Sequence, residues 1–132
     1  MTWQYLDLAD FLIIAEAVLE IDALVLEKVT QTLLASSALD APAAEFGGVE
    51  FYTEPAVKAA ILCSRIIRNH ALPDGNKRVA FMATVEFLER NGFSWEPPID
   101  EAVAAMRHVA SRQMDEEQLA EWITGFLGGN ES

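Results

Sequence analysis

Residues 70–78 hold most of the side chains in this sequence that are capable of chemistry. They read His-Ala-Leu-Pro-Asp-Gly-Asn-Lys-Arg. His70 carries an imidazole, the side chain best suited to act as a general base near neutral pH. Asp74 offers a carboxylate of the kind that holds Mg²⁺ together with phosphate oxygens, and Lys77 and Arg78 can form charge-assisted hydrogen bonds with an anion. These residue types predict a site for a phosphorylated ligand beside a base.

The backbone of this stretch favours the same ligand. Pro73 disfavours helix at Leu72, whereas Gly75 permits unusual backbone angles and lets a phosphate approach closely. A helix that begins near Asn76 presents unpaired N–H groups and the positive end of its dipole to the loop. Each residue alone also has an ordinary explanation, since Asp-Gly-Asn is a common turn, Lys-Arg at a helix start is often solvated, and a histidine that ends a helix is often a cap. Their convergence on nine residues favours a site.

The distribution of charge also indicates an anion site. The chain has 9 basic and 21 acidic residues, for a net charge of −12, which argues against general affinity for nucleic acid or anionic lipid. Five of the nine basic residues nevertheless lie between positions 58 and 78, with Asp74 as the one acid among them. This segment is predicted to bind a compact anion; a helix with a basic solvent face is the alternative.

Length and composition bound the architecture. With 132 residues and 52% hydrophobic content, the chain is expected to form one domain over residues 1–132. The one cysteine, Cys63, excludes a disulfide framework and is predicted to be buried and inert. The N-terminus lacks a basic secretory region and the apolar runs are short, so we expect a soluble cytoplasmic protein with no membrane partner.

Apolar residues recur at helical spacing through nearly the whole chain. The pattern predicts about six helices, over residues 8–19, 23–35, 55–69, 76–90, 100–111 and 116–127. Residues 40–52 break it with Pro42 and Gly47-Gly48 and predict a loop with a short extended flap, while residues 93–95 predict a brief extended piece and residues 128–130 a frayed tail. The expected fold class is all-α, a compact bundle with a small β-like flap.

Residues 70–78 resemble the signature of Fic/Doc proteins, His-x-Phe-x-(Asp/Glu)-(Gly/Ala)-Asn-(Gly/Lys)-Arg. The resemblance extends over residues 46–92, because Phe-Gly-Gly-x-Glu-Phe-Tyr at 46–52 is similar to the family's flap region and Leu-Glu-Arg-Asn-Gly at 88–92 is typical of the helix that follows. Two residues depart from the family pattern. Leu72 stands where the family usually has Phe, which puts the rigidity of the loop in question, and Ala71 replaces a common Pro.

Two positions are similar to the Doc branch of this family. Members that transfer AMP have Gly at the position of Lys77 and a second Arg at the position of Phe81. The resemblance therefore implies a toxin of a toxin–antitoxin pair that binds ATP in a reversed orientation with Mg²⁺. It would transfer the γ-phosphoryl group to a threonine of elongation factor Tu and block translation. An AMP transferase acting on a protein hydroxyl and a catalytically silent helical binding module are the alternatives.

The resemblance also implies a role for each site residue. His70 would deprotonate the acceptor hydroxyl, and Asp74 would hold Mg²⁺. The residues that would grip the phosphates are Gly75, through its backbone, Asn76, Lys77 and Arg78. The flap residues that would align the target by strand addition are Gly48, Val49, Glu50, Phe51 and Tyr52.

Regulation is expected to come from a second protein. Fic proteins are commonly restrained by a helix with the pattern (Ser/Thr)-x-x-x-Glu, and no Glu of this chain follows a Ser or Thr by four positions. This implies an antitoxin that inhibits in trans, with no direct nucleic acid partner. A mean hydropathy of +0.16 agrees with a groove for an amphipathic helix and equally with a tightly packed core.

Overall fold

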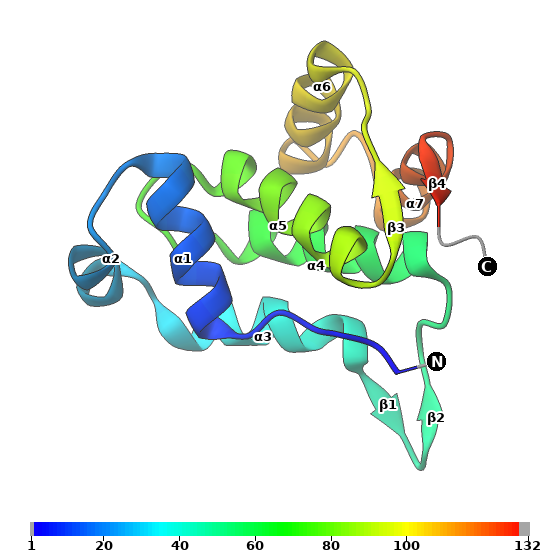
Figure 1. Cartoon of the computed structure of the whole chain (residues 1–132), viewed down its shortest axis with the longest axis horizontal. Helices are drawn as coiled ribbons and strands as arrows, with labels where there is room; N and C mark the ends of the chain where they lie inside the picture. The colour runs from blue at the N-terminus through cyan, green and yellow to red at the C-terminus, as the bar shows by residue number, and fades with distance from the viewer. Residues whose placement is uncertain (1, 130–132) are drawn as a thin grey trace.

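The computed structural model describes residues 2–129 and has an all-α fold, as predicted (Figure 1). In this part of the chain the α-helices are α1 (Leu8–Leu19), α2 (Ala23–Val29), α3 (Thr32–Asp40), α4 (Pro55–Asn69), α5 (Asn76–Arg90), α6 (Ile99–Ala110) and α7 (Glu116–Thr124). The strands form two antiparallel pairs, β1 (Glu45–Phe46) with β2 (Val49–Glu50) and β3 (Phe93–Trp95) with β4 (Leu127–Gly129). Across these residues, no helix combines the length and apolar character that crossing a membrane requires.

Helix α4 is the centre of the core. It contacts α3, α5, α6 and α7, and ten of its 15 residues are buried. Small side chains such as Ala59 and Ala60, both fully buried, let the neighbouring helices approach closely. Cys63 is buried here as predicted, and burial raises the pKa of its thiol to about 12, which keeps it protonated and inert at neutral pH. The C-terminal end of this rigid helix carries His70.

The helix predicted over residues 23–35 is in fact two helices. Thr30 has extended backbone angles, and the N–H of Gln31 donates to the carbonyl of Ala71 at 2.9 Å. This contact joins segments 40 residues apart in the sequence and competes with the local helical hydrogen bonds. The helical periodicity of residues 23–35 could not reveal it, and the predicted count of about six helices was therefore one too low for the described residues.

The C-terminal prediction also needs correction. Helix α7 begins with a capping box between Asp115 and Gln118 and ends at Thr124, not at the predicted residue 127. Residues 127–129 then pair with β3 instead of fraying, while Asn130 lies outside the described residues. A Cβ on Gly129 would lie only 2.9 Å from the backbone nitrogen of Ser94, at a φ of +82°. Glycine here permits the close approach of two strands.

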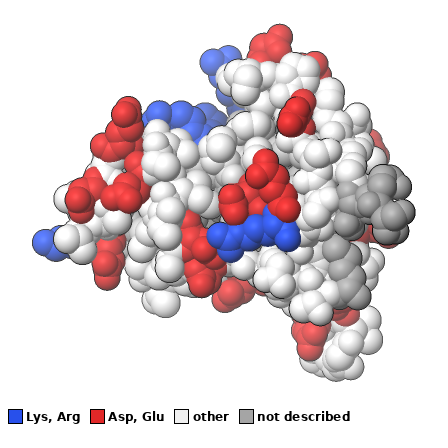
Figure 2. All heavy atoms as spheres, in the orientation of Figure 1, with Lys and Arg blue, Asp and Glu red and all other residues white. Residues whose placement is uncertain are grey.

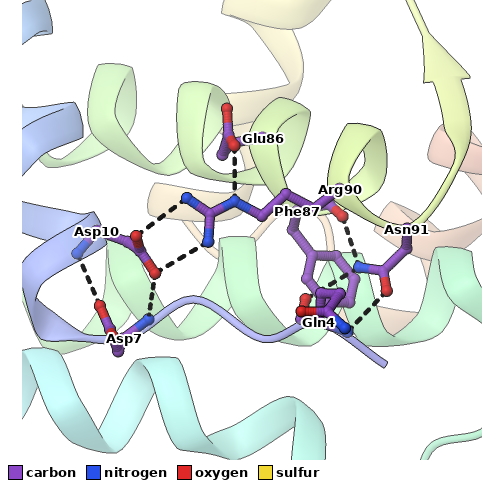
Figure 3. Close-up of polar contacts among 7 residues, drawn as sticks. All are labelled: Gln4, Asp7, Asp10, Glu86, Phe87, Arg90 and Asn91. Atoms are coloured by element: carbon purple, nitrogen blue, oxygen red, sulfur yellow. Dashed lines mark hydrogen bonds and ion pairs between the residues drawn. The ribbon is translucent and has the colours of Figure 1, made fainter. Parts of the chain in front are cut away.

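Polar contacts dock the N-terminal segment and α1 onto the C-terminal end of α5 (Figure 3). The guanidinium of Arg90 binds both carboxylate oxygens of Asp10, at 3.0 and 3.1 Å, and this hydrogen bonding lowers the pKa of Asp10. The amide of Asn91 donates to the carbonyl of Gln4 at 3.0 Å and accepts from its N–H at 2.8 Å. Since Leu19 at the other end of α1 lies against Gly75, α1 and α5 run antiparallel along the site.

Lys58 is a fully buried cation near the start of α4. Its ammonium donates to the hydroxyl of Tyr5 at 2.8 Å, the carbonyl of Pro42 at 3.0 Å and the carboxylate of Glu50 at 3.1 Å. It also lies 5.2 Å from the ring centres of Tyr5 and Trp3. Lys58 therefore ties the β1–β2 hairpin to the core and does not contribute to an anion site.

Replacing Lys58 by alanine should lower the free energy of unfolding by about 3 kcal/mol. The substitution leaves buried acceptors without a hydrogen-bond donor and removes the packing of the alkyl chain. Urea unfolding measures this change. The exposed Lys28 on α2 is the matched control, and Lys28→Ala should change stability by less than about 0.5 kcal/mol. Equal effects of the two substitutions would contradict the structural role of Lys58.

Candidate active site

A pocket of about 460 Å³ lies at the C-terminal end of α4. It brings together all the residues predicted from the nine-residue stretch, namely His70, Asp74, Gly75, Asn76, Lys77 and Arg78. Two further elements complete its lining: the end of α4, with Ile67 and Arg68, and the end of α6 with the following turn, with Ala110 and Arg112. The pocket is therefore built from two segments that are distant in sequence, residues 67–78 and residues 110–112.

His70 ends α4 in the left-handed backbone conformation, with φ 50° and ψ 50°. Histidine adopts this conformation more readily than most residues, and its N–H donates to the carbonyl of Ile66 at 3.4 Å. The ordinary explanation, a helix cap, thus holds for the backbone of His70. Its side chain is exposed and lines the pocket, where it is available to accept a proton.

The carboxamide of Asn76 holds the connection between α4 and α5 in a hydrogen-bonded ring. Its nitrogen donates to the carbonyl of Leu72 at 2.9 Å, and its oxygen accepts from the N–H of Leu72 at 3.1 Å. Both ends of this buried side chain are therefore bound to the backbone of Leu72, which gives Asn76 a positioning role. The expectation that it also grips a phosphate stays a prediction. Leu72 is itself buried in the core, so this departure from the family pattern leaves the loop anchored.

Gly75 precedes α5 with a φ of +79°, and a Cβ at this position would clash with Cδ2 of Leu19. The positive φ favours glycine here, and a larger residue would also displace the end of the Leu19 side chain. No side chain caps α5, and the N–H groups of residues 76–78 cannot find acceptors within the helix. The positive end of the helix dipole adds to them, which makes this corner of the pocket favourable for an anion.

The cations of the pocket differ in whether they are neutralised. Arg68 lies 3.6 Å from the carboxylate of Glu116, which also accepts a hydrogen bond from Arg65 and thereby raises the pKa of Arg65. Within residues 2–129, Lys77 and Arg78 make no ion pair. Figure 2 shows acidic side chains spread over the face in view and basic ones at only a few places. Unpaired positive charge in an acidic protein favours an anionic ligand here.

Asp74 is the one carboxylate among the residues that line the pocket. The described part of the chain holds no group of three His, Cys, Asp or Glu side chains suited to a metal ion. A single carboxylate nevertheless fits Mg²⁺, which takes its other ligands from phosphate oxygens and water.

The predicted flap does not reach this pocket. The β1–β2 hairpin lies before the start of α4, whereas His70 follows its end, and a helix of 15 residues is about 22 Å long. The hairpin extends from the opposite end of α4 in Figure 1, and none of residues 48–52 lines the pocket. The structure therefore separates Gly48, Val49, Glu50, Phe51 and Tyr52 from His70, contrary to a role in aligning a substrate beside it.

An apolar groove of about 610 Å³ adjoins the pocket between α1, α5 and α6. Its apolar lining includes Val18, Phe81, Met82, Ile99, Val103 and Met106. Lys77 and Arg78 line both the groove and the pocket. The sequence predicted no residues for this groove. The spacing of the apolar residues Ile99 and Val103, four positions apart on one helix face, is a signal that could have located it, and both are exposed in the structure.

This chain belongs to the Fic/DOC family, whose model matches residues 5–88. It is similar to a protein named Toxin Doc from Mycolicibacterium smegmatis, with 39% identity over 101 residues. That match covers 75% of this chain and 78% of the relative. The match to the family model includes the whole of the nine-residue signature, all of α4 and all but the last two residues of α5.

Replacing Asn76 by alanine should release the Leu72 backbone and speed hydrogen exchange of the Leu72 amide by about tenfold or more, because each lost buried hydrogen bond costs about 1 kcal/mol or more. Native-state exchange measured by NMR tests this. Asn69→Ala is the matched control, since Asn69 donates to the carbonyl of Leu34 at 3.0 Å and does not line the pocket. Unchanged exchange at Leu72 in Asn76→Ala would contradict the positioning role.

Proposed function

We propose that this chain is a Doc-type toxin that transfers the γ-phosphoryl group of ATP to a threonine hydroxyl of elongation factor Tu and so blocks translation in the cytoplasm. The observation that carries the proposal is one pocket in which His70 and Asp74 lie with the unpaired cations Lys77 and Arg78 at an uncapped helix N-terminus. Membership of the Fic/DOC family and similarity to a protein named Toxin Doc support it.

The proposed reaction uses the pocket residues in one displacement. The imidazole of His70 accepts the proton of the acceptor hydroxyl, whose oxygen forms a bond to the γ-phosphorus. The bond from that phosphorus to the bridging oxygen breaks, and ADP leaves with the electron pair. Lys77, Arg78 and the first N–H groups of α5 neutralise the phosphate charge.

Asp74 would hold Mg²⁺ in this reaction. When bound, the ion would neutralise charge on the phosphate oxygens and help to orient them. The side chain of Asp74 is exposed in the pocket, so it can bind an ion that is shared with the nucleotide.

Two side chains favour transfer of a phosphoryl group over transfer of AMP. Lys77 lines the pocket at the position where the AMP-transferring members of the family have Gly. Phe81 occupies the position of their second Arg, but it lines the apolar groove and packs 5.5 Å from Trp95. The pocket therefore has no cation at that position to clamp a triphosphate in the orientation that AMP transfer requires.

Incubation with purified elongation factor Tu and ATP labelled at the γ- or α-phosphate tests the reaction. Label should transfer from the γ-position, and His70→Ala should lower the rate by about 100-fold or more, because it removes the general base. His108→Ala is the matched control, since His108 is exposed on α6 outside the pocket. Transfer of the α-label would favour the AMP transferase, and transfer of neither label would contradict both activities.

We also propose that an antitoxin inhibits this chain by placing an amphipathic helix in the groove between α1, α5 and α6. The apolar lining suits the apolar face of such a helix, and Lys77 and Arg78 at the edge suit an acidic side chain next to that face. An occupant that pairs with these two cations would also remove them from the phosphate site.

A charge placed in the groove should therefore weaken antitoxin binding. Val103→Asp should lower the affinity for an antitoxin that inhibits this chain by about tenfold or more, as measured by isothermal titration calorimetry. Leu24→Asp, at an exposed apolar position on α2 outside the groove, should bind like the unmodified chain. Equal binding by both variants would show that the antitoxin docks elsewhere.

A further inference from the structure

Arg112 lines the phosphate pocket from a part of the chain that lies outside the Fic/Doc signature. It follows α6, 34 positions after Arg78, and reaches the pocket only because α6 packs against α4 and α5. We propose that Arg112 is a specificity-determining residue that binds the polyphosphate chain of the nucleotide from the third wall of the pocket. This inference rests on the proposed function, in which the ligand is ATP.

The backbone holds Arg112 in a defined place. Its φ of 64° is left-handed, an uncommon conformation for a residue other than glycine. Its N–H donates to the carbonyl of Val109 at 3.1 Å, and the N–H groups of Gln113 and Met114 both donate to the carbonyl of His108, at 2.8 and 3.1 Å. Asp115 then caps α7. The turn is hydrogen-bonded on both sides of Arg112, so the Cα atom of Arg112 is held in place beside the pocket.

The charges around Arg112 also favour an anionic ligand. In the described part of the chain Arg112 makes no ion pair, whereas the neighbouring Glu116 is occupied by Arg65 and Arg68. Lys77 and Arg78 line the same pocket, also without a carboxylate partner. These three cations outnumber Asp74, the one carboxylate of the pocket, and an anion between them reduces their mutual repulsion. A chain of phosphates can contact the cations on both walls of the pocket at once.

Arg112 also supplies a cation that the signature lacks at the position of Phe81. The AMP-transferring members of the family hold the distal phosphates with an Arg at the position of Phe81, which here lies in the apolar groove. A guanidinium supplied by the turn after α6 provides a planar, bidentate phosphate donor from a different direction. The positions of the cations would thus set which part of the nucleotide lies beside His70.

Binding of ATP with Mg²⁺ and of inorganic tripolyphosphate, measured by isothermal titration calorimetry, tests this inference. Arg112→Gly is the main variant because glycine suits the left-handed backbone and leaves the turn intact. It should weaken both ligands by about tenfold, and the KM for ATP should rise by the same factor. Arg112→Lys should weaken them less. Lys28→Ala, an exposed cation outside the pocket, should bind like the unmodified chain.

The outcomes separate this inference from the proposed function. One outcome would overturn the role of Arg112 alone: Arg112→Gly binds both ligands with the same affinity as Lys28→Ala, while Lys77→Ala binds both more weakly. A fall in the melting temperature of ligand-free Arg112→Gly that accounts for the lost affinity would also overturn it, by assigning Arg112 a structural role. An unmodified chain that binds tripolyphosphate through Arg112 but labels no elongation factor Tu would support this inference and contradict the proposed reaction.

Discussion

The geometry of the site depends on the two hydrogen bonds between the carboxamide of Asn76 and the backbone of Leu72. They close the turn between the two longest described helices, α4 and α5, and so set the angle at which the end of one meets the start of the other. His70 directly follows the first helix as its C-cap, and Lys77 and Arg78 belong to the second. A turn held in this way presents the base and the cations to the same space without relying on their own exposed side chains for rigidity.

Six of the nine basic residues form two groups that differ in their partners. Lys58, Arg65 and Arg68 are bound by protein oxygens and hold the structure together. Lys77, Arg78 and Arg112 are left without carboxylate partners around the pocket. A count of basic residues between positions 58 and 78 could not make this division, because the partners Tyr5, Pro42 and Glu116 lie far away in the sequence. The count did indicate the correct region of the chain.

Local patterns predicted the elements whose ends depend on nearby residues. The helices over residues 8–19, 55–69 and 76–90 have the predicted bounds, since capping by Asp7, the proline at position 55 and the glycines at 75 and 92 act within one turn. The break at Thr30 and the strand at residues 127–129 depend on distant partners, Ala71 and Ser94. The hairpin was recognised from its glycines, but its distance from His70 depends on the length of the buried helix between them. The motif identified most of the pocket, while Arg112 carries no motif at all.

Lys77 and Arg78 form a shared boundary between the pocket and the groove. If the pocket binds phosphate as proposed, a molecule in the groove that draws these side chains toward itself would lower the affinity of the pocket for phosphate. Thermodynamic linkage then requires the reverse effect by the same factor, so that bound nucleotide loosens the occupant of the groove. The balance between the two ligands would make occupancy of each cavity respond to the cellular concentration of the other ligand.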